Sequence, residues 1–336
     1  MTEPGELHED PAFGFDPVRT PVRVGPDLVT PLEAVEAAEA PVGPEGGESQ
    51  STGGIGIQIW RVFIEHKLAL VSLCFIIAMV LFCFAGPLVY HTIQNNQEAV
   101  LLNPENSPPG PGHPLGTTGT GFDVLGRLMY GGQTSLIVGF LSALAATVIG
   151  VIYGAFSGFF GRWLDALMMR LVDVVLSIPI IFMLIALVTI FHASEPLLII
   201  VIAAVSWLIP ARLVRDETLT LRTREYVQAV KAMGGRGGRI VGRHIIPNAI
   251  GTIVVFATFQ VATSILILAA LGFLGFGVPP PQTDWGSMLS TAVDSAGNGW
   301  WWEIYPVGIC IVLVVIAFNF IGDALRDALE VRTQRR

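Results

Sequence analysis

The stretch RLVRDETLTLRTREYVQAVKAMGGRGGRIVGRHIIPN, residues 212–248, separates two long apolar runs of the chain. It contains eight of the nineteen Lys and Arg residues. Residues 225–233 have helical spacing, and glycines at 234, 235, 237 and 238 then end that helix, because glycine readily takes the left-handed conformation found just after a helix. A second helical stretch starts at Arg239 and leads through Pro247 into the next apolar run. The segment therefore predicts a short helix, a sharp turn and a helix that enters a membrane.

Apolar runs on both sides of this segment are long enough to cross a bilayer. Because a span needs about 20 residues and water is absent from the hydrocarbon, each run is expected to be helical. Glycines at 150, 154 and 158, four residues apart, predict a flat strip for close helix packing. The third run is expected to kink at Pro179. We expect six transmembrane helices, at residues 68–90, 134–160, 174–191, 196–211, 248–271 and 304–322.

The overall composition agrees with an all-α membrane protein. The 336 residues are 52% apolar and only 14% charged, whereas soluble domains are about one quarter charged. Acidic residues concentrate in residues 1–54, a Pro- and Gly-rich segment that we expect to be a disordered cytoplasmic tail. The remaining regions are predicted as the first span with its approach (55–95), an extracytoplasmic loop (96–133), a five-helix core (134–322) containing the basic loop 212–247, and a cytoplasmic tail (323–336).

The distribution of Lys and Arg predicts the orientation. With the N-terminus inside and six crossings, 18 of the 19 basic residues fall in inner segments and only Arg127 lies outside. This positive-inside bias predicts that both termini are cytoplasmic. The outer loop 272–303 contains no Lys or Arg, and three tryptophans at 300–302 precede the last span.

Several kinds of chemistry lack the residues that they require. Neither Lys67 nor Lys231 follows a glycine, so the sequence contains no P-loop for ATP. The middle of each span is free of ionisable residues, which disfavours an ion-coupled carrier. The histidines lie in tails, loops or span edges, which disfavours an intramembrane enzyme. A membrane scaffold that recruits cytosolic proteins through the basic loop remains an alternative.

The basic loop resembles the cytoplasmic EAA loop of ABC importer permeases, whose pattern is roughly E-A-A-x3-G-x9-I-x-L-P. The matching residues are Gln228, Ala229, Val230, Gly234, His244, Ile246 and Pro247. Further stretches are similar to the C-type permease subunit of dipeptide and oligopeptide importers, a resemblance that covers about residues 60–332. These stretches are HPLGT (113–117), DVLGRLMYGGQTSLIVG (123–139), GRWLDALMMRLVDVVLSIP (161–179), GFLGFGVPPPQTDWGSML (272–289) and AFNFIGDALRDALEVR (317–332).

The resemblance implies a type I ABC importer fold and an ATP-driven peptide importer in the cytoplasmic membrane. Its other parts would be a second, B-type permease subunit, two ATPase domains that bind ATP and Mg²⁺, and an extracytoplasmic binding protein. This chain would form half of the pore, catalyse no reaction and hold no cofactor, metal or nucleic acid. A nickel complex or haem is an alternative cargo. The residues expected to couple to the ATPase are Glu225, Tyr226, Gln228, Ala229, Val230, Met233, Gly234 and Pro247.

Two further regions have open interpretations. Gln260, Thr263 and Ser264 are polar and lie three and four residues apart in the fifth span, so they are expected to share a helix face. They would line the translocation path or hydrogen-bond between helices within the bundle. The outer loop 272–303, which contains three consecutive prolines at 279–281, would close the outer mouth, dock the binding protein or serve as packing alone.

Overall fold

The computed structural model describes residues 63–94, 100 and 103–334, with side chains as far as Leu329. The predicted acidic tail, residues 1–54, lies outside this part. Regular structure in the described residues is helical, accompanied by two isolated β-bridges. The helices are α3 (Lys67–Val89), α5 (Val124–Phe160), α6 (Arg162–Leu176), α7 (Ile180–Phe191), α8 (Glu195–Ser206), α9 (Leu208–Leu221), α10 (Glu225–Ala232), α11 (Gly237–Ile240), the π-helix η1 (Val241–Ile245), α12 (Ile246–Phe273), α13 (Trp285–Ala296) and α14 (Trp301–Gln334).

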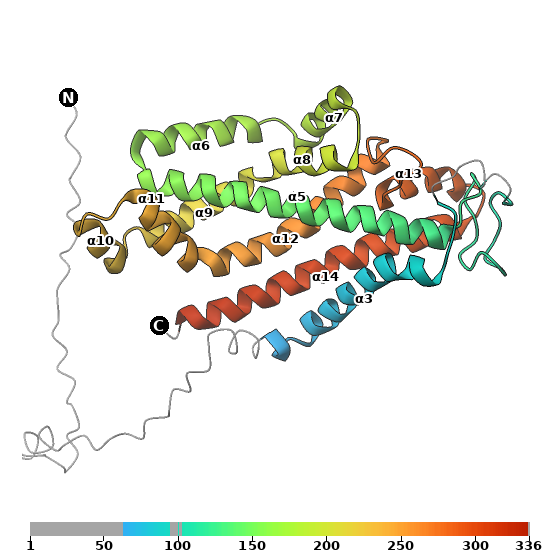
Figure 1. Cartoon of the computed structure of the whole chain (residues 1–336), viewed down its shortest axis with the longest axis horizontal. Coiled ribbons are helices and arrows are strands. Elements are labelled where there is room, and N and C mark those ends of the chain that lie inside the picture. The colour runs from blue at the N-terminus through green and yellow to red at the C-terminus, as the bar shows by residue number, and fades with distance from the viewer. Residues whose placement is uncertain (1–62, 95–99, 101–102, 335–336) are drawn as a thin grey trace, which may run out of the picture. The chain divides into compact units, whose positions relative to one another are not determined.

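Six spans are confirmed when each bent pair of helices is taken as one. Four continuous helices are long and apolar enough to cross: α3, α5, α14 and the run from α11 through α12. The pair α6 and α7 bends by 82°, and the pair α8 and α9 bends by 42°. Successive spans alternate in direction between one end that carries α10 and the end of α14, and another that carries α13 (Figure 1). The predicted basic loop lies at the first end, which the positive-inside rule makes the inner one.

Proline accounts for both bends. Pro179 has no N–H and disfavours helical geometry at the preceding residue, so α6 ends at Leu176 and α7 begins after Pro179. The predicted kink is therefore a break in the helix. In the second pair, Pro210 lies in the first turn of α9, where a missing N–H costs no hydrogen bond, and the chain bends at Trp207 just before it.

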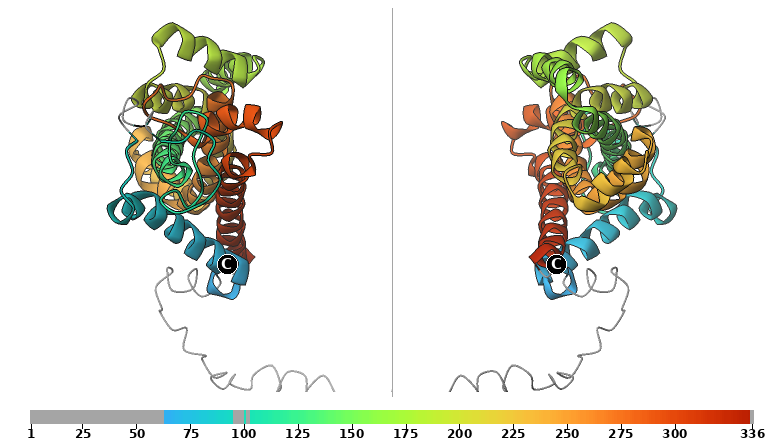
Figure 2. Two further views of the ribbon diagram at one scale, coloured as in Figure 1. Left: turned by 90° about the vertical axis from the view of Figure 1, so that its right-hand side faces the viewer. Right: turned by 90° about the vertical axis from the view of Figure 1, so that its left-hand side faces the viewer.

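Helix α5 is the centre of the bundle, and it packs against α9, α12, α8 and α3 (Figures 1 and 2). The predicted glycine strip forms its closest contact. A Cβ atom added at Gly150 would lie 2.6 Å from Pro210 Cβ, and one at Gly158 would lie 2.8 Å from the carbonyl oxygen of Arg215. Glycine at these positions allows the backbones of α5 and α9 to approach each other, as the spacing predicts.

Several helices differ from the expected boundaries. α9 continues to Leu221 and α14 to Gln334, beyond the predicted ends of their spans at 211 and 322, so the predicted tail 323–336 begins as helix. α5 begins at Val124, ten residues before the predicted start of the second span, so the predicted outer loop 96–133 ends in helix. The Asp123 side chain caps it by accepting a 2.7 Å hydrogen bond from the Gly126 N–H. The predicted outer loop 272–303 contains the amphipathic helix α13, which is capped in the same way by Asp284, a 3.0 Å acceptor for the Ser287 N–H.

Candidate functional site

The element α10–turn–α11 forms locally as the sequence predicts. Helix α10 runs from Glu225 to Ala232 and ends in a Schellman motif, in which Gly235 N–H donates to Val230 O (3.0 Å) and Gly234 N–H to Lys231 O (3.1 Å). Gly234 has φ +82°, and no atom lies within 4 Å of the position of a Cβ there. The requirement for glycine at 234 therefore comes from backbone geometry and not from lack of space.

The inner face of this element is anchored to the bundle. Val227 is 1% exposed and belongs to an apolar cluster that includes Ile240 of α11, Ile245 of η1 and Ala155 of α5. Val230 is half-buried against the same cluster. α10 is therefore packed against the inner end of the bundle through these apolar contacts.

The predicted apolar side of α10 divides into two parts. Tyr226 is 42% exposed, Met233 is 78% exposed, and Ala229 is also exposed. Val230, which is also among the residues expected to couple to the ATPase, instead packs partly against the bundle. Val227, which was not among the residues predicted to couple, is the buried anchor. It shares the inward face with Val230, because residues three apart lie on the same side of a helix. Exposed Tyr226, Ala229 and Met233 leave an apolar surface on α10 uncovered by this chain.

Polar contacts reinforce the anchor. Gln228 donates from Nε2 to the carbonyl oxygen of Arg222 (2.8 Å), and Arg222 donates from Nη1 to the carbonyl oxygen of Gly158 (2.8 Å). Nearby, Arg215 of α9 makes two 2.6 Å hydrogen bonds to the Asp165 carboxylate of α6. These bonds connect α10, α9 and α6 to the inner end of α5.

The turn continues without a break into the fifth span. α11, the π-helix η1 and α12 follow one another from Gly237 to Phe273. Pro247 occupies the first turn of α12, and the π-helix η1 lies directly before it. In a regular α-helix the proline ring would clash with the carbonyl group four residues earlier, and the wider π-helix relieves this clash. Beside this junction an open cleft of about 860 Å³ is lined by the end of α9, the start of α10 and the start of α12, including Glu225, Tyr226 and Pro247.

The three candidate pathway residues occupy different environments. Gln260 (8% exposed) and Ser264 (0%) are buried inside the chain, where Gln260 Nε2 lies 3.5 Å from Ser264 Oγ. Thr263 is exposed and donates to the carbonyl oxygen of Phe259 at 3.0 Å. The three residues share one side of α12 by their spacing, but Thr263 differs from the other two in being exposed. For Gln260 and Ser264 the contacts favour packing within the bundle, the alternative to the pathway.

No cluster for a metal ion is present in the part of the chain that the structure describes: three or more His, Cys, Asp or Glu side chains do not converge there. A cavity that the sequence did not indicate lies at the outer end, between the loop before α5, the segment that follows α12, α13 and the start of α14.

Comparison with known families identifies the chain. Residues 117–335 match the family described as "binding-protein-dependent transport system inner membrane component". The chain belongs to this family. Residues 56–109 of this permease component match the N-terminal transmembrane domain of oligopeptide transport permease C. It is thus a multi-pass membrane subunit of a transporter and not itself an enzyme.

Curated relatives cover most of the permease. It is 41% identical over 268 residues to the dipeptide transport system permease protein DppC of Alkalihalophilus pseudofirmus, covering 79% of this chain and 86% of the relative. It is 36% identical to the oligopeptide transport system permease protein OppC of Haemophilus influenzae, covering 82% of this chain and 89% of the relative.

A solved structure confirms the fold. A chain of the MetNI methionine ABC transporter, in an inward-facing conformation, superposes with a TM-score of 0.51 at 22% identity. The match covers 60% of this permease and 96% of that chain. The common fold is the type I ABC importer permease fold that the sequence resemblance implied.

Proposed function

We propose that this permease is one half of the pore of an ATP-driven peptide importer in the cytoplasmic membrane, and that α10 couples it to an ATPase subunit. The observation that carries the proposal is that α10 connects through the Gly234 turn, α11 and η1 to α12 without any further loop. One face of α10 is fixed to the bundle through Val227, while the side chains of Tyr226 and Met233 are exposed on another side.

The exposed face is suited to a protein partner. It is apolar at its centre and is flanked by Arg224 and Arg236, both exposed. Apolar contacts surrounded by polar groups are typical of protein interfaces, whose outer charges mainly set association rate and register. The cleft of about 860 Å³ beside Tyr226 offers a concave surface next to this helix. A groove on an ATPase subunit that holds α10 would contact both the apolar surface of the helix and this cleft.

The contacts also provide a route for movement. When two ATPase subunits close on ATP and Mg²⁺, α10 is displaced as a rigid body, because its Schellman turn and the Val227 anchor resist local bending. The displacement passes through α11 and η1 to α12, which packs against α5 and α14. ATP and Mg²⁺ would be held by the partner subunits, while this chain transmits the movement.

Peptide cargo is proposed from the relatives, which are named as dipeptide and oligopeptide permeases. The remaining assembly would be a second permease subunit, two ATPase subunits and an extracytoplasmic binding protein that delivers the peptide. Cargo such as a nickel complex or haem stays an alternative, as does a scaffold that transports nothing.

Gentle solubilisation of native membranes containing a tagged chain, followed by mass spectrometry, tests the assembly. The proposal predicts co-purification of an ATPase, a second six-span subunit and a binding protein, and ATP-dependent uptake of labelled dipeptide after reconstitution. An intact, monodisperse chain that brings down neither ATPase nor second permease would contradict it and favour the scaffold.

A further inference from the structure

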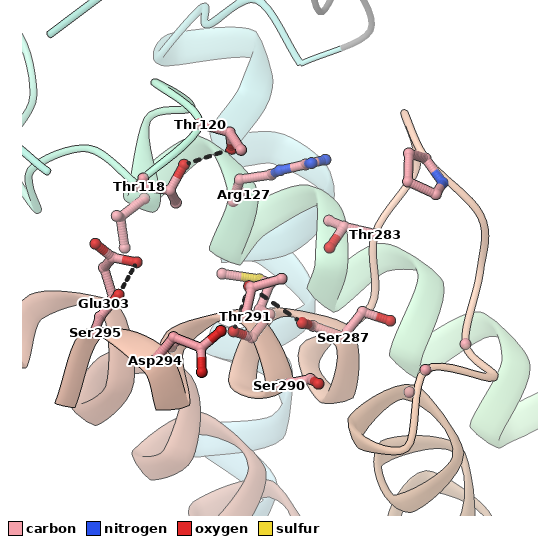
Figure 3. A pocket seen from close by; sticks show the side chains of 18 of the residues that line it. Thr118, Thr120, Arg127, Thr283, Ser287, Ser290, Thr291, Asp294, Ser295 and Glu303 are labelled. Carbon is pink, nitrogen blue, oxygen red and sulfur yellow. Dashed lines mark hydrogen bonds between the residues drawn. The ribbon is translucent and has the colours of Figure 1, made fainter. Parts of the chain in front are cut away.

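An open cavity of about 610 Å³ (Figure 3) lies beside α13, at the end of the permease opposite α10 (Figure 1). Its walls come from the loop before α5, the first turn of α5, residues 272–283 at and after the end of α12, α13 and the first turn of α14. Small-molecule sites usually measure about 300–1,000 Å³ and combine apolar walls with a few placed polar groups. This cavity has that composition, because its walls are mainly apolar and carry the hydroxyl groups of Thr118, Thr120, Ser290 and Thr291.

Glu303 is the most unusual group in the wall. Its side chain belongs to the first turn of α14 and is only 5% exposed. One carboxyl oxygen, Oε2, accepts a 3.0 Å hydrogen bond from Ser295 Oγ, whereas Oε1 has no hydrogen-bond partner within the described residues. A buried polar atom without a partner is costly, and such atoms are rare in native proteins. A cationic donor in the cavity would supply the missing bond.

The cavity carries both signs of charge. Asp294, exposed on α13, lines it together with Glu303, and Arg127 of α5 supplies the positive charge from a different wall (Figure 3). The Arg127 guanidinium stacks on the Phe122 ring at 3.8 Å and donates from Nη1 to the carbonyl oxygen of Pro281 at 2.7 Å. These contacts fix the plane of the guanidinium, and its five N–H donors leave others for a ligand.

We propose that this cavity binds the two charged termini of a short peptide as it enters the permease. The peptide ammonium group would bond to Glu303 Oε1 with Asp294 close by, and its carboxylate would bond to Arg127, whose forked geometry suits a carboxylate. Hydroxyl groups of the wall would bond to the peptide backbone between them. This inference rests on the proposed function and adds a substrate site on the permease itself, separate from the binding protein.

The test uses the assembled transporter in proteoliposomes and a photoreactive dipeptide, alanyl-photomethionine. After illumination, mass spectrometry locates the cross-links on this chain. We expect labelling of residues 118–127 and 287–303, and no labelling there by the N-acetylated probe. Glu303→Gln keeps the size and the bond to Ser295 but loses the charge, and should reduce labelling about tenfold at subsaturating probe.

Two further variants keep the test decisive. Asp294→Asn changes an exposed residue, so the fold should survive, and a smaller loss in the same direction is expected. Glu105→Gln removes a negative charge from the same outer loop region at an exposed residue that does not line the cavity, and should label like the wild type.

The outcomes separate this inference from the proposed function. A wild-type transporter that takes up no peptide overturns both. A wild type that takes up peptide, but whose labelling lies outside the cavity or is unchanged by Glu303→Gln and Asp294→Asn, overturns the inference alone. The inference is also overturned if these variants weaken binding of the binding protein and leave peptide labelling intact, since the cavity would then be a docking site for that protein.

Discussion

Arg222 donates a hydrogen bond from Nη1 to the backbone carbonyl oxygen of Gly158, 2.8 Å away and 64 residues earlier in the chain. Gly158 lies in the last turn of α5, where helix carbonyls lack N–H partners in their own helix. Arg222 directly precedes the α10 segment and accepts from Gln228 through its own carbonyl oxygen. Arg222 thus links α10 to α5, the central helix of the bundle.

Replacing Arg222 should loosen this link. Arg222→Met keeps the apolar stem but removes the donors, so we expect the free energy of unfolding to fall by about 1–2 kcal/mol. In the assembled transporter the ratio of peptide-stimulated to basal ATPase activity should also fall. Arg224→Met, at an exposed position two residues on, is the control and should leave stability unchanged. Equal stability of the two variants would argue against the link.

The close approach of α5 and α9 should be sensitive to a single methyl group. A Cβ atom at Gly154 would collide with the carbonyl oxygen of Ala211. Gly154→Ala should therefore destabilise the chain by about 1–3 kcal/mol, the usual cost of overpacking. Thermal unfolding in detergent measures the effect. Gly308→Ala on α14, where no atom lies within 4 Å of the added Cβ, is the matched control and should unfold like the wild type.

The two faces of α10 should respond differently to truncation. Val227→Ala removes buried methyl groups and should speed amide hydrogen exchange across α10 by weakening its anchor by about 1–2 kcal/mol. Met233→Ala should leave exchange unchanged in the isolated chain, since Met233 is 78% exposed, but reduce the amount of ATPase that co-purifies. If Met233→Ala retained the ATPase fully, the exposed face of α10 would not be the contact surface.

Tyr90 provides a pH-dependent contact at the outer end. Its hydroxyl lies 3.0 Å from Asp123 Oδ2, and burial together with the Asp123 charge raises the pKa of Tyr90 from 10.0 to about 12. Because the folded state favours the protonated phenol, this contribution to stability is complete below pH 10 and is lost as the pH rises through 12. The stability difference between wild type and Tyr90→Phe should therefore be constant from pH 6 to 9 and shrink above pH 10. A difference that shrinks below pH 9 would contradict this assignment.

The spans and the glycine turn after α10 were predictable because their causes are local. A bilayer requires long apolar helices, and the glycines after Met233 end a helix whatever surrounds them. The burial of Val227 was harder to predict from the sequence. α10 has apolar residues on both faces, and only the position of α5 decides which face is covered. The same holds for Gln260 and Ser264, whose environment depends on neighbouring helices.

The outer end was the least predictable part. Helix α13 carries a capping signal at Asp284, but the prolines before it and the glycines and serines around it indicate a loop. Arg127 and Glu303, which are far apart in the sequence, line the same outer cavity only because α5, α13 and α14 pack together. Charge and spacing along the chain contain no signal for this shared cavity.

Coupling through the Gly234 turn is tested most directly by a pair of glycine variants in the reconstituted transporter. Gly234→Val places a β-branched residue at φ +82°, whereas Gly238→Val changes a neighbouring glycine that has open space and an ordinary φ. With both variants inserted and assembled normally, Gly234→Val should abolish peptide uptake and its coupled ATP hydrolysis, and Gly238→Val should retain them. Full uptake and coupling in Gly234→Val would contradict the central claim that this turn transmits movement from an ATPase to α12.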